Sequence, residues 1–228
     1  MCKDQITYQR KTEVTADGSN TLYIPEMDEH YHSIKGAETE SRHIFLEMGF
    51  NQCKQDTIKV LEIGFGTGLN AYLTLRTAEE KQKKVNYYSI ELYPLSWETV
   101  KALNYSEEAD FRALHICEWN KQIAIKEKFH LYKWEVDFTK EDFVIGLEEK
   151  GPFDLIYFDA FAPEKQPEMW NDQLFKLLYV NMNKGGVLTT YCAKGMVRRM
   201  LQSVGFIVER LPGPPEGKRE ILRATKFQ

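Results

Sequence analysis

The sequence predicts an α/β protein with a doubly wound, mostly parallel sheet of seven strands and an N-terminal β-hairpin extension. Short apolar runs alternate with segments of helical periodicity, as in successive β-α units. The run 152–162 (PFDLIYFDAFA) is almost continuously apolar, which is typical of a strand covered on both faces. The last two β-prone runs, 206–211 and 220–225, are separated by a linker short enough for an antiparallel hairpin.

Residues 1–56 form the predicted extension, and residues 57–228 form the predicted main domain. In the extension, two β-prone runs flank Asp17-Gly18-Ser19-Asn20, which predicts a hairpin. The segment 37–50 (AETESRHIFLEMGF) has apolar residues at helical spacing and should lead into the first central strand. Tyr31 and His32, just before this helix, are candidates for the rim of a pocket.

The elements of the main domain follow from the same patterns. Strands are expected within 58–63 and at 85–91, 129–136, 152–162, 186–193, 206–211 and 220–225. Helices are expected from about residue 69, from Pro94, and over 110–128, 166–182 and 195–204.

The segment LEIGFGTGLN (61–70) predicts a strand, a tight turn and a helix. Gly64, Gly66 and Gly68 allow a sharp turn and close approach to a ligand, and the helix directs free N–H groups toward it. Leu69 stands where the dinucleotide-binding pattern has its third glycine, and the loop contains no lysine or arginine. The loop therefore predicts a nucleotide-type cofactor other than a dinucleotide.

Four acidic residues lie at the ends of four predicted strands: Glu62, Glu91, Asp137 and Asp159. They should converge, because ligands of such sheets bind outside the carboxyl ends of the strands. Carboxylates repel a pyrophosphate, whereas they suit ribose hydroxyls, an exocyclic amine and a positively charged sulfonium. This combination predicts S-adenosylmethionine as the cofactor.

The segment 159–163 (DAFAP) predicts the catalytic group. A carboxylate that leaves a strand beside the cofactor can accept hydrogen bonds from a substrate amine and take its proton, while Phe161 packs on a planar base. Methyl transfer requires an unprotonated nucleophile held in line with the methyl carbon. Asp159 is therefore the predicted catalytic residue, and the alternative is that it only caps the turn.

Composition restricts the class of protein further. The net charge of −4 argues against a non-specific polyanion binder, although basic residues concentrate late in the chain, so nucleic acid stays possible. The four cysteines show no metal-binding spacing, so no metal is predicted. No segment has the pattern of a membrane span or a signal peptide, so we expect a cytoplasmic protein with no membrane partner.

Four segments carry a resemblance: LEIGFGTGLN, FDAFAPEKQPEMWNDQLF, GGVLTTYCAKGMVRRMLQSVGF and GKREIL. Together they resemble the methyltransferase module that completes 5-methylaminomethyl-2-thiouridine at the wobble position of tRNA. The resemblance covers nearly the whole chain. It implies a Rossmann-like class I methyltransferase fold, S-adenosylmethionine, and methylation of the primary amine of 5-aminomethyl-2-thiouridine. The implied partner is a tRNA anticodon stem-loop.

The resemblance also implies site residues by position. The cofactor-binding set is Glu62, Gly64, Phe65, Gly66, Gly68, Asn70, Glu91, Asp137 and Asp159. The basic residues late in the chain could separately form a track for the phosphates of a stem-loop. With them, the substrate-binding set is Phe161, Pro163, Lys165, Trp170, Lys194, Arg198, Lys218 and Arg219. In some bacteria this module is fused to a flavin-dependent oxidase that first removes a carboxymethyl group. A second dinucleotide fingerprint is missing here, so this chain is expected only to methylate, and a separate oxidase could supply its substrate.

Two other functions stay open from the residues alone. One is a methyltransferase or aminopropyltransferase that acts on a small amine, which an acidic pocket would suit equally. The other is a nucleotide-binding dehydrogenase, which the glycine spacing disfavours.

Overall fold

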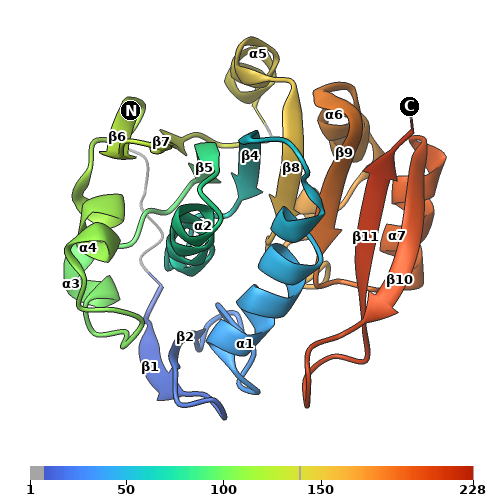
Figure 1. The fold of residues 1–228 in the computed structure, drawn as a ribbon. Coiled ribbons are helices and arrows are strands. Elements are labelled where there is room, and N and C mark those ends of the chain that lie inside the picture. Colours follow the sequence, from blue (N-terminus) through green and yellow to red (C-terminus); the bar gives the residue numbers. More distant parts are fainter. Residues whose placement is uncertain (1–7, 139, 228) are drawn as a thin grey trace.

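The computed structural model describes residues 8–227, apart from residue 139 and the side chain of residue 142. Its central sheet has eight strands in the order β10-β11-β9-β8-β4-β5-β7-β6 (Figure 1). The bounds are β4 (Thr57–Ile63), β5 (Lys84–Glu91), β6 (Gln122–Lys126), β7 (Phe129–Glu135), β8 (Phe153–Phe158), β9 (Met182–Thr190), β10 (Phe206–Pro212) and β11 (Glu220–Lys226). Strands β4, β5, β7, β8 and β9 pair in parallel, and β11 is antiparallel to both β9 and β10. The predicted doubly wound α/β fold is confirmed.

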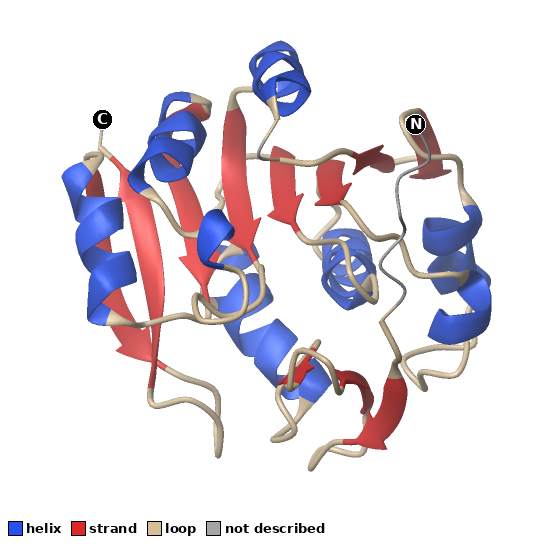
Figure 2. Ribbon diagram, turned by 180° about the vertical axis from the view of Figure 1, so that it is seen from behind, coloured by secondary structure: helices blue, strands red, loops and turns tan. Residues whose placement is uncertain are grey.

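Helices cover both faces of this sheet (Figures 1 and 2). One face carries α2 (Leu69–Glu80), α3 (Trp97–Val100) and α4 (Ala109–Ile116). The other carries α5 (Glu141–Lys150), α6 (Asp172–Val180) and α7 (Gly195–Ser203). Successive side chains of a strand point to opposite faces, so β4 packs Val60 on the α2 side and Leu61 on the other. Burying each such side chain contributes about 1.5–3 kcal/mol, which is why the central strands are apolar throughout.

The N-terminal extension forms a separate three-stranded antiparallel sheet of β1 (Lys11–Val14), β2 (Asn20–Ile24) and β3 (Glu29–His30). The predicted hairpin is confirmed, and Asp17 closes its turn by accepting a hydrogen bond from the Ser19 amide at 3.1 Å. In Figure 1 this small sheet lies below the carboxyl ends of the central strands. It therefore covers the edge where a ligand would bind.

The predicted helix before β4 is also present. It consists of α1 (Ala37–Ser41), the π-helical segment η1 (Arg42–Glu47) and a 3₁₀ turn, η2 (Phe50–Gln52). Ile44, Phe45 and Phe50 are buried in the same core cluster as α2, so the extension shares its core with the main domain.

The helix predicted over 110–128 is wrong beyond Ile116, where α4 ends. Asn120 has a φ of 59°, which a continuing helix cannot accommodate, and Ile123 and Ile125 alternate as in a strand. This segment forms β6, antiparallel to β7, so the sheet has one strand more than predicted. The helix predicted from residue 166 begins only at Asp172, because the Asn171 side chain caps it by accepting from the Leu174 amide.

The topological switch point lies between β4 and β8, since the chain leaves β4 toward β5 and β7 and later returns beside β4 as β8. The two loops that follow these strands are in contact. The Asp159 amide donates to the Ile63 carbonyl at 3.1 Å, and a Cβ on Gly64 would lie 3.0 Å from the Asp159 carbonyl oxygen. No helix within the described residues is long and apolar enough to cross a membrane.

Gly68, which precedes α2, provides a stability test of the glycine loop. Its φ is 71°, and a Cβ there would lie 2.6 Å from His115 Nε2. Gly68→Ala should therefore lower the free energy of unfolding by roughly 2–4 kcal/mol in urea denaturation, from backbone strain plus steric conflict. Gly185→Ala is the matched control, since Gly185 has a φ of 74° and open space around the added Cβ. Its loss should be only about 1–2 kcal/mol, and equal losses in the two variants would contradict the role assigned to the contact with His115.

Candidate active site

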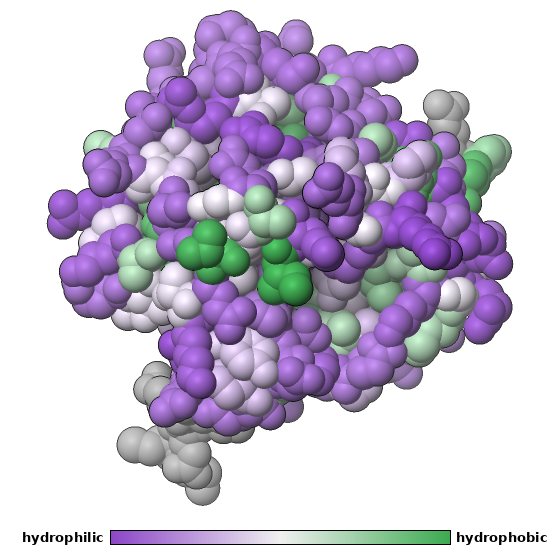
Figure 3. All heavy atoms as spheres, turned by 90° about the horizontal axis from the view of Figure 1, so that it is seen from below, coloured by the Kyte–Doolittle hydropathy of each residue, from purple (hydrophilic) through white to green (hydrophobic). Residues whose placement is uncertain are grey.

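A cavity of about 920 Å³ lies at the carboxyl ends of the parallel strands, between the central sheet and the small N-terminal sheet. Its lining comes from the glycine loop, the segments that follow β5, β7, β8 and β9, and the N-terminal strands. Figure 3 views this side of the molecule, where hydrophobic residues gather near the middle of a mostly hydrophilic surface. The volume is at the upper end for small-molecule sites, which leaves room for a nucleotide-sized cofactor and a second ligand.

Glu91 lies at the end of β5 with its carboxylate fixed against the glycine loop. The Gly66 amide donates to Oε2 and the Tyr93 amide donates to Oε1, each at 2.9 Å. Each oxygen retains a second lone pair, so the carboxylate can still accept from two neighbouring hydroxyl groups. The loop itself is folded back on β5, since the Gly64 and Phe65 amides both donate to the Ile90 carbonyl at 3.0 Å.

Asp159 lines the same cavity, just after β8. Asn70, in the first turn of α2, donates from Nδ2 to Asp159 Oδ2 at 2.8 Å. Burial raises the pKa of Asp159 to about 7, and the charge of Glu40 adds to the rise, while the Asn70 hydrogen bond and Lys218 oppose it. Asp159 can therefore exchange a proton near neutral pH.

Glu40 and Lys218 form an ion pair at the cavity, which joins α1 to the loop between β10 and β11. Lys218 Nζ is 2.6 Å from Glu40 Oε1, and the Ser33 amide donates to Oε2 at 2.9 Å. The same Nζ lies 4.1 Å from the centre of the Tyr191 ring. Sequence reasoning missed Glu40, because an acid in an amphipathic helix has the same pattern whether it faces solvent or a pocket.

The small N-terminal sheet docks onto the glycine loop through Tyr31 and His32, which line the cavity as expected. His32 Nε2 is 2.7 Å from Thr67 Oγ1, and burial lowers the pKa of His32 to about 4, so this histidine is neutral. The Tyr31 ring lies 5.3 Å, edge to face, from the Phe161 ring. Arg10 Nε donates to the Tyr31 hydroxyl at 3.3 Å. Sequence reasoning also missed Arg10, which no motif distinguishes.

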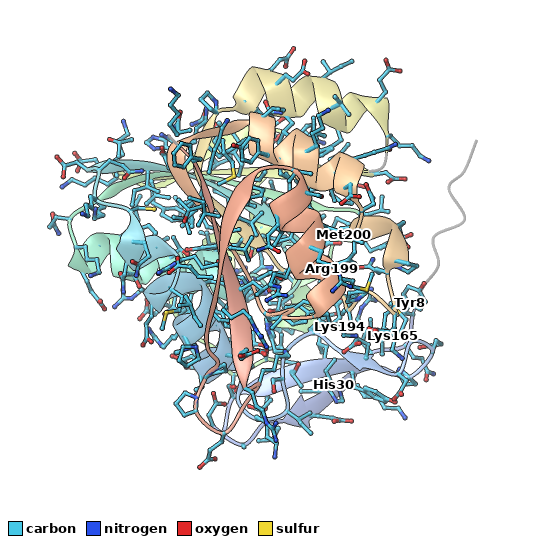
Figure 4. All side chains as sticks on the ribbon, turned by 90° about the vertical axis from the view of Figure 1, so that its right-hand side faces the viewer. Tyr8, His30, Lys165, Lys194, Arg199 and Met200 are labelled. Atoms are coloured by element: carbon cyan, nitrogen blue, oxygen red, sulfur yellow. The ribbon has the colours of Figure 1, made fainter. Side chains whose placement is uncertain are left out.

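Most of the residues predicted for the site do line this one cavity. They are Gly64, Phe65, Gly66, Asn70, Glu91, Asp137, Asp159, Phe161, Pro163, Lys165, Lys194 and Lys218. Lys165 and Lys194 lie at its mouth, between Arg199 and His30 in Figure 4, and Lys194 pairs with Glu164.

Five predicted residues do not line the cavity. The Glu62 side chain points into the core, where the Ser89 hydroxyl donates to it at 2.6 Å, and Gly68 lies under the packed rings of His115 and Phe65. The remaining three also lie outside the cavity lining. Trp170 is buried behind the loop and donates from Nε1 to the Phe161 carbonyl, Arg198 lies along α7, and Arg219 is exposed on the last hairpin.

Comparison with known proteins shows the family to which the chain belongs. Residues 80–227 match the model of a family described as S-adenosyl-L-methionine-dependent methyltransferase. The chain belongs to this family.

The side chains of the described residues form no group of three or more His, Cys, Asp and Glu that could hold a metal ion.

This methyltransferase is similar to proteins named tRNA 5-methylaminomethyl-2-thiouridine biosynthesis bifunctional protein MnmC. The one from Leptospira interrogans is 31% identical over 210 residues, covering 86% of this chain and 32% of the relative. The one from Actinobacillus pleuropneumoniae is 28% identical over 234 residues, covering 93% of this chain and 34% of the relative. The chain thus spans about a third of these relatives, and the predicted resemblance to their methyltransferase module is confirmed.

Two solved structures have folds similar to that of this chain. The methyltransferase resembles MnmC2 from Aquifex aeolicus with a TM-score of 0.78 and 25% identity, over 96% of this chain and 70% of that one. It shares only its fold with spermidine synthase from Thermotoga maritima, at a TM-score of 0.55 and 11% identity, over 98% and 82% of the two chains.

Proposed function

We propose that this methyltransferase binds S-adenosylmethionine in the cavity and methylates the primary amine of 5-aminomethyl-2-thiouridine at the wobble position of tRNA. The observation that carries the proposal is the position of Asp159, a carboxyl group that lines the same cavity as Glu91, lies beside the glycine loop and accepts a hydrogen bond from Asn70 at 2.8 Å. The names of the bifunctional relatives support the choice of nucleoside.

The residues around the glycine loop fit this cofactor. Gly64 and Gly66 bring backbone close to the cavity, and Glu91 offers two carboxylate oxygens to a pair of ribose hydroxyls. Asp137 follows β7 in the same cavity and suits the exocyclic amine of adenine. When bound, S-adenosylmethionine supplies a methyl group on a positively charged sulfur, which the surrounding carboxylates stabilise.

Asp159 would perform the proton chemistry on the substrate. An aminomethyl group is largely an ammonium ion near neutral pH, and it becomes a nucleophile only when a proton leaves. The ionised carboxylate can accept a hydrogen bond from this amine, orient its lone pair and hold the released proton. Asn70 fixes the carboxylate from the other side, and Phe161 offers an aromatic ring to the pyrimidine.

The cationic rim favours tRNA over a small free amine. Lys165, Lys194 and Lys218 line the cavity beside its carboxylates, and Lys194 and Lys218 pair with Glu164 and Glu40. Cationic side chains would repel a small ammonium substrate, whereas they attract the phosphates that flank a wobble nucleotide.

The test offers both substrates together. The protein is incubated with methyl-labelled S-adenosylmethionine, a mixture of polyamines, and tRNA from cells that lack this enzyme. We expect label in the tRNA fraction and none in the polyamines. Label in a polyamine alone would establish the small-molecule alternative.

The rim gives a second prediction. Reversing the charges in a Lys165→Glu, Lys194→Glu double variant should raise KM for tRNA about tenfold or more at physiological salt, because two phosphate contacts are lost. The Kd for S-adenosylmethionine, measured by calorimetry, should not change. Lys184→Glu is the control, since Lys184 is exposed near the opposite end of β9. An unchanged KM in the double variant would argue against contacts between these two lysines and the tRNA phosphates.

The pKa of Asp159 gives a third prediction. With a pKa of about 7, Asp159 is protonated below neutrality and cannot accept a proton from the amine. The value of kcat/KM should therefore rise about tenfold per pH unit below pH ~7 and level off above it. A pH–rate profile that stays flat between about pH 5.5 and 8 would contradict this role for Asp159.

A further inference from the structure

Glu40 is a carboxylate at the cavity that the proposed reaction does not use. It is buried on α1 and lines the cavity. The Ser33 amide donates to its Oε2 at 2.9 Å, and Lys218 Nζ donates to its Oε1 at 2.6 Å. These two donors fix the carboxylate, and each of its oxygens keeps a lone pair for a further donor.

The two members of this ion pair differ in their freedom to move. The Glu40 side chain is 10% exposed, whereas the Lys218 side chain is 41% exposed and belongs to the loop between β10 and β11. An ion pair with an exposed member contributes little to stability, because water competes for the charges. The lysine stem is flexible, so Nζ can leave for another acceptor while the Ser33 amide still holds Glu40. Lys218 is therefore the mobile partner.

This ion pair lies beside Asp159, the group assigned to the reacting amine. The Tyr191 hydroxyl donates at 2.8 Å to the carbonyl of Ala160, the residue after Asp159. Lys218 Nζ lies 4.1 Å from the centre of the Tyr191 ring. Burial raises the pKa of Asp159, the charge of Glu40 raises it further, and Lys218 opposes the rise, so both charges act on Asp159. An amine that contacts Asp159 therefore comes close to Glu40 as well.

The charges of this ion pair match those of the proposed substrate. An aminomethylated wobble nucleotide carries an ammonium group on its base and has phosphates beside it. A free polyamine has only cations, so it would have to displace Lys218 without offering an acceptor to it. Unmodified tRNA has only phosphates, so it would draw Lys218 away and leave Glu40 without a cation, which is unfavourable for a buried carboxylate.

We propose that Glu40 is a specificity-determining residue that exchanges its ion-pair partner when the substrate tRNA binds. Lys218 moves from Glu40 to a phosphate beside the wobble nucleotide, and the ammonium of the aminomethyl group takes its place at Glu40. Glu40 and Asp159 then both contact this ammonium before Asp159 accepts its proton. No covalent bond changes in the exchange itself. The inference rests on the proposed function, because it requires a substrate that carries both charges.

Two synthetic anticodon stem-loops that differ only in the amine test the exchange. One carries 5-aminomethyl-2-thiouridine at the wobble position and the other carries 5-methyl-2-thiouridine. Their Kd values are measured without S-adenosylmethionine, so that no methyl group is transferred. The wild type should prefer the aminomethyl stem-loop about a hundredfold, since two contacts to an ammonium contribute about tenfold each. Glu40→Gln should reduce this preference to about tenfold, because only the contact with Asp159 remains.

Lys218→Met should have a different effect. It should weaken the binding of both stem-loops equally and lower the slope of log Kd against log salt concentration by about 1, because a phosphate contact is lost. The preference for the amine should not fall. Equal losses for both stem-loops in Glu40→Gln as well as in Lys218→Met would make the ion pair a structural tie between the loop and α1, and would overturn the proposal.

Glu38→Gln is the matched control. Glu38 is also on α1, but it pairs with Arg42 at 2.7 Å and does not line the cavity. The Kd values of Glu38→Gln for both stem-loops should equal those of the wild type. A loss of preference in this variant as large as that in Glu40→Gln would overturn the assignment to Glu40.

The free nucleoside gives a second readout. 5-Aminomethyl-2-thiouridine carries the ammonium without a phosphate, so Lys218 should hinder its access to Glu40. Lys218→Met should therefore bind the nucleoside about tenfold more tightly than the wild type in an NMR titration. The Lys218→Met, Glu40→Gln double variant should lose this gain. A Lys218→Met variant that binds the nucleoside no better than the wild type would overturn the proposal.

The stem-loop measurements also separate this inference from the proposed function. A wild type that prefers the aminomethyl stem-loop, together with a Glu40→Gln variant that keeps the full preference, would overturn the exchange and leave the proposed function standing. A wild type that binds both stem-loops equally would overturn the proposed nucleoside and the exchange together.

Discussion

Asp159→Asn is expected to lower kcat for methyl transfer to tRNA roughly a hundredfold or more, because orientation of the amine and acceptance of its proton are lost together. The asparagine oxygen can still accept the hydrogen bond from Asn70. The Kd for S-adenosylmethionine should therefore stay close to the wild-type value. Single-turnover methyl transfer together with calorimetry would measure the two quantities.

Stability distinguishes this role from turn capping. Burial raises the pKa of Asp159 from 3.8 to about 7, so the folded wild type loses stability as pH rises between these values. Asp159→Asn should melt at the same or a higher temperature than the wild type at about pH 8. Asp154→Asn is the control, since Asp154 accepts from the Lys59 amide and from Asn183 at the opposite end of β8. It should melt earlier yet retain turnover, and the reverse pattern would make Asp159 a structural residue.

Glu91→Ala should weaken S-adenosylmethionine binding about a hundredfold or more. The substitution removes two charge-assisted acceptors for ribose hydroxyls, each contributing about 1.5–3 kcal/mol. It also leaves the Gly66 and Tyr93 amides without their acceptor, which loosens the glycine loop. Calorimetric titration of the purified variant measures the loss.

Glu135→Ala is the matched control for Glu91. Glu135 is the register partner of Glu91 on β7, but it is exposed and does not line the cavity. The Kd of Glu135→Ala for S-adenosylmethionine should equal that of the wild type. If Glu91→Ala also binds with wild-type affinity, the cofactor is not held by this carboxylate.

The sequence predicted the sheet and the main acidic groups because both follow from local patterns. Continuous apolar runs mark strands covered on two faces, and the glycine loop marks the turn after β4. Glu91 and Asp159 stand at or just beyond the ends of such strands, and the carboxyl ends of parallel strands necessarily meet. Their convergence therefore needed no knowledge of tertiary packing.

The rest depended on packing between distant segments. Glu62 lies in phase with Ile58 and Val60, so its side chain points to the α2 face, one position short of the strand end. Glu40 and Arg10 reach the cavity only because the N-terminal extension and α1 fold under the central strands. No local pattern in the sequence reports such docking.

Nucleoside analysis of tRNA tests the central claim most directly. Transfer RNA from cells lacking this enzyme is incubated with the protein and S-adenosylmethionine, digested to nucleosides and examined by mass spectrometry. We predict that 5-aminomethyl-2-thiouridine decreases while 5-methylaminomethyl-2-thiouridine appears in equal amount, and that Asp159→Asn slows this conversion. A wild-type protein that binds the cofactor but leaves 5-aminomethyl-2-thiouridine unchanged would contradict the account.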